Sequence, residues 1–221
     1  MMSFALERFV ELRPFLFHLT FSENLESILH SRHLYPAAYF LKAESRLDGI
    51  GTRRKSHLAL NGTHGKIFIR DQSPLKEGHV SWEAGWDMPR FVGHLNQHVF
   101  FWPGGPEGPI LYGRNHLERY RKEKPVLLKI PTAGLIDSRS KPPAMFCPWN
   151  SGAPRISNGK KCPRGSRTFL SAQEADFTAG KAVEVAFRGK VDLPYTFEYL
   201  DGRDGIWRVN YASCIQFDDD K

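Results

Sequence analysis

Polar side chains interrupt two short apolar runs that are otherwise typical of buried strands. His18 and Thr20 lie in the first run, which spans residues 15–20 and leads into a helical pattern. Glu184 lies in the second, the alternating stretch 182–187. A carboxylate beside a sugar stabilises the positive charge that builds up when a glycosidic bond breaks. Glu184 is therefore a side chain that suits such chemistry.

Aromatic and basic residues indicate what a site of this kind would bind. A cationic ring needs an apolar, aromatic wall, and a diphosphate needs arginines or backbone N–H groups. The strand-like run 98–102 supplies Phe100 and Phe101, and Arg53 and Arg54 follow a Gly-Ile-Gly turn. The sequence has no GxGxxG after a strand and no GxxxxGK[ST] motif, so it indicates neither of those two nucleotide-binding modes.

Each polar residue also has an ordinary structural explanation. Taken alone, His18 is better explained as a core histidine that bonds a backbone carbonyl. Taken alone, Glu184 is better explained as an exposed position on a half-buried strand, since its apolar neighbours alternate with it. Function is favoured only because both occur with the aromatic and basic residues described above.

Composition predicts one globular domain. The chain has 221 residues, of which 41% are hydrophobic and 13% aromatic, enough to bury a sizeable core. Its apolar runs are far shorter than the roughly 18 residues that a membrane-spanning helix needs, and the first residues do not form a signal pattern. Cys147, Cys162 and Cys214 form no CxxC pair, which favours reduced thiols in a cytoplasmic protein and no metal site.

The charge of the chain is positive and uneven. There are 31 Lys and Arg against 24 Asp and Glu, a net charge of +7. Basic clusters occupy residues 53–55, 114–124 and 160–167. Such clusters attract nucleic acids and nucleotide phosphates, although an ordinary solvated face explains them equally well.

The hydrophobic pattern predicts the elements that position these residues. Helices are expected at residues 3–13, 22–29, 36–43, 88–95 and 111–122, and strands at 15–20, 98–102, 125–131, 182–187 and 191–194. A hairpin is expected at 57–70 around Asn61-Gly62. Residues 137–168 are predicted to be a long functional loop, because they are dense in Pro, Gly and basic residues. We expect one domain over residues 1–217 and an acidic tail at 218–221.

These motifs together resemble the ADP-ribosyltransferase fold, and most of all the DarT-type toxins, which modify DNA with NAD. The likeness rests on the His-x-Thr strand, the Asn24-Leu25-Glu26-Ser27-Ile28-Leu29 helix start, the Phe-Phe-Trp strand and the late strand Val183-Glu184-Val185-Ala186-Phe187. The chain also looks like an uncharacterised bacterial single-domain family, through blocks at 70–72, 100–104, 150–155 and 163–165. The first resemblance implies an α+β domain with a split, mostly antiparallel sheet.

The same resemblance implies roles for particular residues. Glu184 would be the catalytic carboxylate, and Arg53 or Arg54 the catalytic arginine, with Arg70 as an alternative. His18 would bind the ribose and Thr20 the nicotinamide amide. The full set of implied cofactor-binding residues is His18, Thr20, Asn24, Phe100, Phe101 and Tyr112.

The long loop is where such transferases carry target recognition. It combines a stacking side chain with phosphate-binding charge, as single-stranded nucleic acid requires. Its expected acceptor-binding residues are Trp149, Asn150, Arg155, Arg164 and Arg167. A structural role for Trp149 at the edge of the core is the alternative.

We therefore expect a monomeric, NAD-dependent mono-ADP-ribosyltransferase with NAD as co-substrate, no metal, and nucleic acid as the favoured acceptor. The alternatives are a protein acceptor, an NAD-using RNA phosphotransferase that would not need Glu184, and a binding module of the same fold without catalysis. A cysteine hydrolase built on Cys147 is a further alternative, although no base is placed beside that thiol.

Overall fold

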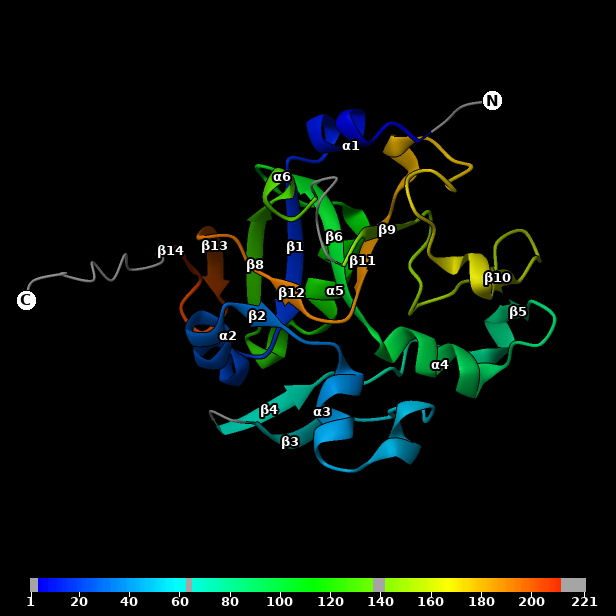
Figure 1. Ribbon diagram of the computed structural model, residues 1–221, viewed down its shortest axis with the longest axis horizontal. Coiled ribbons are helices and arrows are strands. Elements are labelled where there is room, and N and C mark those ends of the chain that lie inside the picture. The colour runs from blue at the N-terminus through cyan, green and yellow to red at the C-terminus, as the bar shows by residue number, and fades with distance from the viewer. Residues whose placement is uncertain (1–3, 63–64, 137–141, 212–221) are drawn as a thin grey trace, which may run out of the picture.

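An eight-stranded sheet forms the centre of the computed structural model, which describes residues 4–62, 65–136 and 142–211 (Figure 1). Its strands lie in the order β14-β13-β8-β1-β6-β11-β9, with β7 beside β6 and all neighbours antiparallel. Their bounds are β1 Phe15–Thr20, β6 His98–Gly105, β7 Gly108–Pro109, β8 Val126–Pro131, β9 Ala144–Cys147, β11 Glu184–Arg188, β13 Thr196–Asp201 and β14 Ile206–Tyr211. The prediction of a single α+β domain with a mostly antiparallel sheet is confirmed.

The sheet is split between β1 and β6. Their ladder ends where Phe17 faces Trp102, although β1 stays paired with β8 as far as Thr20. On the other side, β6 stays paired with β11 back to His98. The two halves of the sheet therefore share one end and separate at the other.

Six helices accompany the sheet in the described part of the chain. They are α1 Leu6–Leu12, α2 Leu25–Ser31, α3 Ala37–Ala43, α4 Met88–Asn96, α5 Leu111–Arg119 and α6 Thr132–Leu135. The α4 helix is capped by Asp87, whose carboxylate accepts the backbone N–H of Arg90 at 2.8 Å. It buries Phe91, Val92 and Leu95 and leads through one residue into β6, which fixes the start of that strand.

A hairpin lies with α3 below the end of the sheet where β1 and β6 separate (Figure 1). It consists of β3 (Leu58–Gly62) and β4 (Gly65–Ile69), as the turn sequence predicts. The amide of Asn24 holds it in place. Its Oδ1 accepts the N–H of Phe68 and its Nδ2 donates to the carbonyl of the same residue, both at 2.8 Å. Asn24 thus bonds the hairpin as a neighbouring strand would.

The prediction of one long irregular loop over residues 137–168 is wrong. Residues 144–147 are β9, an edge strand of the main sheet, and β10 (Cys162–Arg164) pairs in parallel with β5 (Val80–Trp82). Phe146 and Cys147 are buried, so this segment contributes to the core although Pro and Gly surround it. Residues 137–141, Cys214 and the expected acidic tail lie outside the described residues.

Two further pairings went unpredicted. The hairpin of β13 and β14 extends the sheet beyond β8, and β2 (His33–Leu34) pairs with β12 (Val191–Asp192). Among the helices that the structure describes, none has the length and apolar character needed to cross a bilayer.

Candidate functional site

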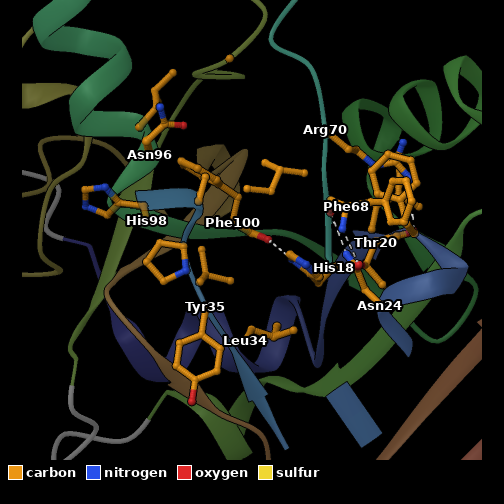
Figure 2. Close-up of a pocket in the computed structure, with 18 of the residues that line it drawn as sticks. His18, Thr20, Asn24, Leu34, Tyr35, Phe68, Arg70, Asn96, His98 and Phe100 are labelled. Atoms are coloured by element: carbon orange, nitrogen blue, oxygen red, sulfur yellow. Dashed lines mark hydrogen bonds between the residues drawn. The ribbon is translucent and has the colours of Figure 1, made fainter. Parts of the chain in front are cut away.

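A cavity of about 370 Å³ opens where the two halves of the sheet separate (Figure 2). Its walls come from β1, β6, the hairpin, α2, α3 and the turn at residues 150–153. A volume of this size falls within the range of small-molecule sites, which are concave and mostly apolar with a few polar groups. His18, Phe100 and Glu184 all line it, although the sequence separates them widely.

His18 lies on β1 at the point where the split begins. Its Nδ1 is 2.9 Å from the carbonyl oxygen of Phe100 on β6. Because a carbonyl can only accept, Nδ1 carries the proton and Nε2 keeps its lone pair. Burial, with the nearby charge of Arg70, lowers the pKa of His18 to about 4. His18 is therefore a neutral acceptor at physiological pH, and it also makes the backbone contact that its structural explanation requires.

The two neighbouring phenylalanines of β6 point to opposite faces, as strand geometry demands. Phe100 lines the cavity. Phe101 is fully buried and packs edge-on against Phe187, with ring centroids 5.5 Å apart. The expectation that Phe101 could form the aromatic wall is wrong, and Phe100 holds that position.

Glu184 opens β11 and is only 4% exposed. Its Oε2 accepts the backbone N–H of Ser151 at 3.0 Å. Burial raises its pKa to about 7, and the hydrogen bonds from Ser151 and the charge of Arg164 oppose that rise. The exposed-strand explanation of Glu184 is therefore wrong, because the carboxylate lies at the inner wall of the cavity and is costly to ionise.

The arginines expected near the diphosphate differ in where they point. Arg54 lines the cavity, and its Nε donates to the carbonyl of Arg70 at 2.9 Å while Nη1 donates to Asn96 Oδ1 at 2.9 Å. Arg53 instead donates to the carbonyl of Leu75 and does not line this cavity. Arg53 is thus an unsuitable ligand-binding residue.

The charge of Arg54 lacks a carboxylate in ion-pair contact among the described residues. Its contacts are neutral oxygens, and burial lowers its pKa to about 10, so it is still a cation at neutral pH. The charge of Asp71 opposes that fall in pKa, but its carboxylate does not bond the guanidinium. A partly buried cation with no bonded carboxylate favours an anionic ligand.

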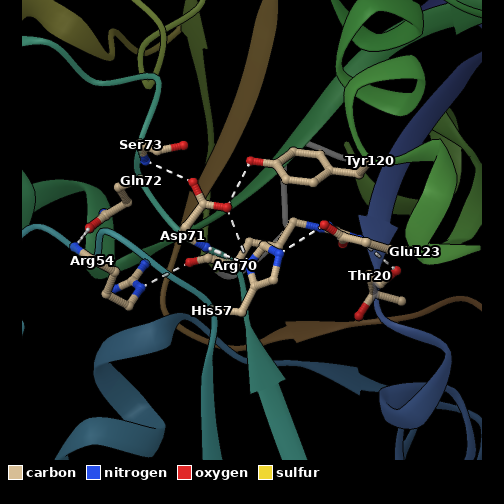
Figure 3. Close-up of polar contacts among 9 residues, drawn as sticks. All are labelled: Thr20, Arg54, His57, Arg70, Asp71, Gln72, Ser73, Tyr120 and Glu123. Atoms are coloured by element: carbon tan, nitrogen blue, oxygen red, sulfur yellow. Dashed lines mark hydrogen bonds and ion pairs between the residues drawn. The ribbon is translucent and has the colours of Figure 1, made fainter.

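Arg70 also lines the cavity, but its guanidinium is held in a polar network (Figure 3). Its guanidinium lies between the rings of Phe21 and Tyr120, at 4.3 and 4.4 Å from their centroids. Nη1 pairs with Glu123 at 2.7 Å, and Nη2 donates to the carbonyl of Thr20. Because Glu123 neutralises it, Arg70 is a structural link between the hairpin and β1.

His57 and Asp71 complete this network. His57 Nε2 is 2.9 Å from Glu123, and Asp71 accepts the hydroxyl of Tyr120 at 3.1 Å. Thr20 is also held by its surroundings, since its hydroxyl accepts Asn24 Nδ2 at 3.1 Å. Thr20 and Asn24 line the cavity, but both are already engaged in fixing its wall.

Most of the expected acceptor-binding residues lie away from this cavity. Arg164 is 2% exposed and its donors bond main-chain carbonyls, so the expectation that it binds phosphate is wrong. Arg167 pairs with Asp176 on the surface. Arg155 is exposed. Asn150 does line the cavity.

Trp149 and Tyr112 lie together at a second, shallower pocket. Trp149 is 37% and Tyr112 43% exposed, and Arg13 and Lys181 line the same hollow. Tyr112 on α5 does not line the main cavity, so the expectation that it binds the cofactor there is wrong. Trp149 is largely covered, with the guanidinium carbon of the buried Arg164 5.6 Å from its ring centroid, so a structural role at the edge of the core stays as the alternative.

Sequence reasoning missed the polar groups that orient the site. Asn96 and Gln72 fix Arg54, through bonds to its guanidinium and its backbone N–H. Ser151 fixes Glu184. Asn96 is 2% exposed at the end of the apolar face of α4, and a polar residue at such a position was the one available signal.

Two other kinds of site are not supported. The described residues contain no group of three or more His, Cys, Asp or Glu that could hold a metal ion. Cys147 is fully buried, and burial raises the pKa of its thiol, so it lacks the exposed thiolate that a cysteine hydrolase needs.

Comparison with known proteins places the chain in one family. Residues 14–193 match the model of a family of unknown function (DUF7002), and the chain belongs to that family. The match covers β1 to β12 and so includes every residue of the cavity described above. The chain matches no curated protein and no solved structure.

Proposed function

We propose that this protein is an NAD-dependent mono-ADP-ribosyltransferase whose favoured acceptor is nucleic acid. The observation that carries the proposal is that His18, Phe100 and Glu184 line one cavity at the split of the sheet. They come from β1, β6 and β11, and each is the residue that the resemblance to ADP-ribosyltransferases implies.

The donor site would use the wall residues according to their chemistry. The nicotinamide ring would lie against Phe100, and the neutral His18 would accept a hydrogen bond from a ribose hydroxyl through Nε2. The diphosphate would bind Arg54, the cavity cation whose contacts are neutral oxygens. Glu184 would then face the ribose that carries the bond to be broken.

The reaction follows from this arrangement. The bond between the ribose anomeric carbon and the nicotinamide nitrogen breaks, and its electron pair leaves with neutral nicotinamide. The ionised Glu184 stabilises the oxocarbenium ion that forms. A nitrogen or oxygen of the acceptor supplies the electron pair for the new bond to the anomeric carbon and releases its proton to solvent. NAD and acceptor thus give ADP-ribosyl acceptor, nicotinamide and a proton.

Nucleic acid is favoured as the acceptor because of the second pocket. Trp149 and Tyr112 are partly exposed beside two cations, Arg13 and Lys181. Among the described residues, the one acid in this wall is Asp176, which is paired with Arg167. Stacking and phosphate contacts of this kind suit single strands of any sequence. Trp149 and Val183 of this pocket are the chain neighbours of Asn150 and Glu184 in the main cavity.

The test is transfer of label from NAD to an acceptor. NAD carrying ³²P in its adenylate phosphate is incubated with separate pools of single-stranded DNA, RNA and protein. We expect label in a nucleic acid pool and a turnover number lower by about 10² to 10³ for Glu184→Gln. Glu7→Gln, at an exposed position on α1, is the matched control.

Three outcomes would contradict the proposal in different ways. Label found only in the protein pool would show that the acceptor is protein and not nucleic acid. Transfer at the normal rate by Glu184→Gln would exclude the mechanism. NAD left intact with every pool would identify a binding module without catalysis.

A further inference from the structure

We propose that Arg164 is a positioning residue, which fixes the carboxylate of Glu184 through the peptide group between Asn150 and Ser151. The consequence for catalysis rests on the proposed function, whereas the coupling itself does not. Arg164 is only 2% exposed, although arginine is almost never so deeply buried without a partner. Its buried charge therefore calls for an explanation.

One peptide group lies between the two charged side chains. The carbonyl oxygen of Asn150 accepts Arg164 Nη2 at 2.8 Å, and the N–H of Ser151 donates to Glu184 Oε2 at 3.0 Å. These atoms belong to the same planar unit, whose C=O and N–H point in opposite directions. The guanidinium on one side therefore fixes the direction of the donor on the other. The cation also polarises the peptide, which strengthens its hydrogen bond to the carboxylate.

The remaining donors of Arg164 bond the same turn and the neighbouring residues of β10. Nε donates to the carbonyl of Ser151 at 3.2 Å, and Nη1 donates to the carbonyl of Pro163 at 2.8 Å and contacts Cys162 Sγ at 3.0 Å. The consecutive carbonyls of Asn150 and Ser151 are thus bound by one rigid, planar guanidinium group. A lysine has a single ammonium group and cannot reproduce that geometry.

Few charged groups face Glu184 from the elements around it. On β9 the residue paired with it is Cys147, whose thiol is kept neutral because burial raises its pKa. On β6 the nearest paired positions are Phe101 and Phe100. Arg164, from β10, is the cation whose charge favours ionised Glu184. No acid among the described residues forms an ion pair with Arg164.

Arg167 provides a matched control. It lies three residues further along and is also an arginine, but its side chain is 63% exposed and pairs with Asp176. Replacing Arg167 by Lys should leave Glu184 unaffected, and replacing Arg164 by Lys should not.

The experiment measures the titration of Glu184 directly. In protein labelled with ¹³C at glutamate Cδ, the Glu184 signal is assigned by its loss in Glu184→Gln and followed from acid to alkaline pH. Arg164→Met should raise the midpoint by about one pH unit, because a nearby cation is lost. Arg164→Lys should raise it by less, and Arg167→Lys should not change it.

The native protein supplies a second measurement that does not depend on the variants folding. The amide proton of Ser151 and the Nε proton of Arg164 should shift with the same midpoint as the Glu184 carboxylate. Midpoints that differ, or a Glu184 titration unchanged in a folded Arg164 variant, would overturn the proposal and leave Arg164 a purely structural residue.

Activity distinguishes this inference from the proposed function. If both hold, Arg164→Lys lowers the turnover number for ADP-ribosyl transfer about twofold to fivefold at neutral pH, with little change in the KM for NAD, and alkaline pH restores it. Coupled titration in a protein that does not turn over NAD would support the positioning role and exclude the transferase. ADP-ribosyl transfer without coupled titration would support the transferase and exclude the positioning role of Arg164.

Discussion

Replacing Glu184 by Gln should make the protein more stable at alkaline pH. Burial raises the pKa of this carboxyl from 4.5 to about 7, so the folded state binds the proton more tightly than the unfolded state does. Between those two pH values the unfolded state holds fewer protons, and stability falls as pH rises. The loss is complete above pH 7 and amounts to a free energy on the order of 3 kcal/mol.

A glutamine avoids this loss because it is neutral at every pH and keeps an oxygen that can accept the Ser151 N–H. The free energy of unfolding is measured by urea titration, followed by tryptophan fluorescence, at about pH 5 and about pH 8.5. We expect the two proteins to be similar at the lower pH and Glu184→Gln to be more stable by up to about 3 kcal/mol at the higher one.

The control is Glu7→Gln, at an exposed position, for which the difference from wild type should not depend on pH in this way. A difference between Glu184→Gln and wild type that is the same at both pH values would refute the argument. It would mean that the carboxylate is solvated well enough to ionise freely.

Three further predictions concern the walls of the cavity and the second pocket. Arg54→Gln should raise the KM for NAD about tenfold to a hundredfold, because one charge-assisted bond is lost. Arg53→Gln should not raise it, because the Arg53 side chain bonds the carbonyl of Leu75 instead. Equal effects of the two variants in steady-state kinetics would exclude Arg54 as the diphosphate ligand. Asn24→Ala leaves the N–H and C=O of Phe68 without their partner and should lower the free energy of unfolding by about 2 to 4 kcal/mol. Ser22→Ala should lower it by almost nothing, because the Ser22 hydroxyl bonds the exposed side chain of Glu23. Similar urea midpoints for the two variants would show that the hairpin is held by other contacts. Trp149→Ala should weaken binding of a fluorescent single-stranded oligonucleotide about tenfold or more. Trp207→Ala, at a similarly exposed tryptophan on β14, should leave the affinity unchanged. Equal losses of affinity in anisotropy titrations would show that the second pocket is not the acceptor surface.

The central strands could be predicted because their pattern leaves little choice. β1, β6 and β8 are short apolar runs bounded by proline, glycine or helix signals. β9 and β10 were missed because they have four and three residues and lie among prolines and glycines. They form because β11 and β5 offer partners, and such partners are not visible in the local sequence.

Part of the candidate site could also be predicted from the sequence. Residue types and resemblance predicted His18, Phe100 and Glu184, which line one cavity. Which of Phe100 and Phe101 faces it depends on the register of β6 against its neighbours, and composition does not determine register. Arg164 was misassigned for the same kind of reason. A basic residue in a Gly-rich and Pro-rich stretch resembles a surface charge until the turn that surrounds it is known.

The attachment of the hairpin by Asn24 has a consequence for how this cavity can change over evolutionary time. At residue 68, Asn24 bonds the N–H and C=O of the main chain, so these two bonds do not depend on the side chain there. Phe68 nevertheless lines the cavity. The ring of Phe68 also packs near Phe21, with centroids 5.7 Å apart, and Phe21 in turn covers the Arg70 guanidinium. Relatives can therefore reshape the space open to a ligand at position 68 without altering the bonds from Asn24, provided that the new side chain still packs against Phe21.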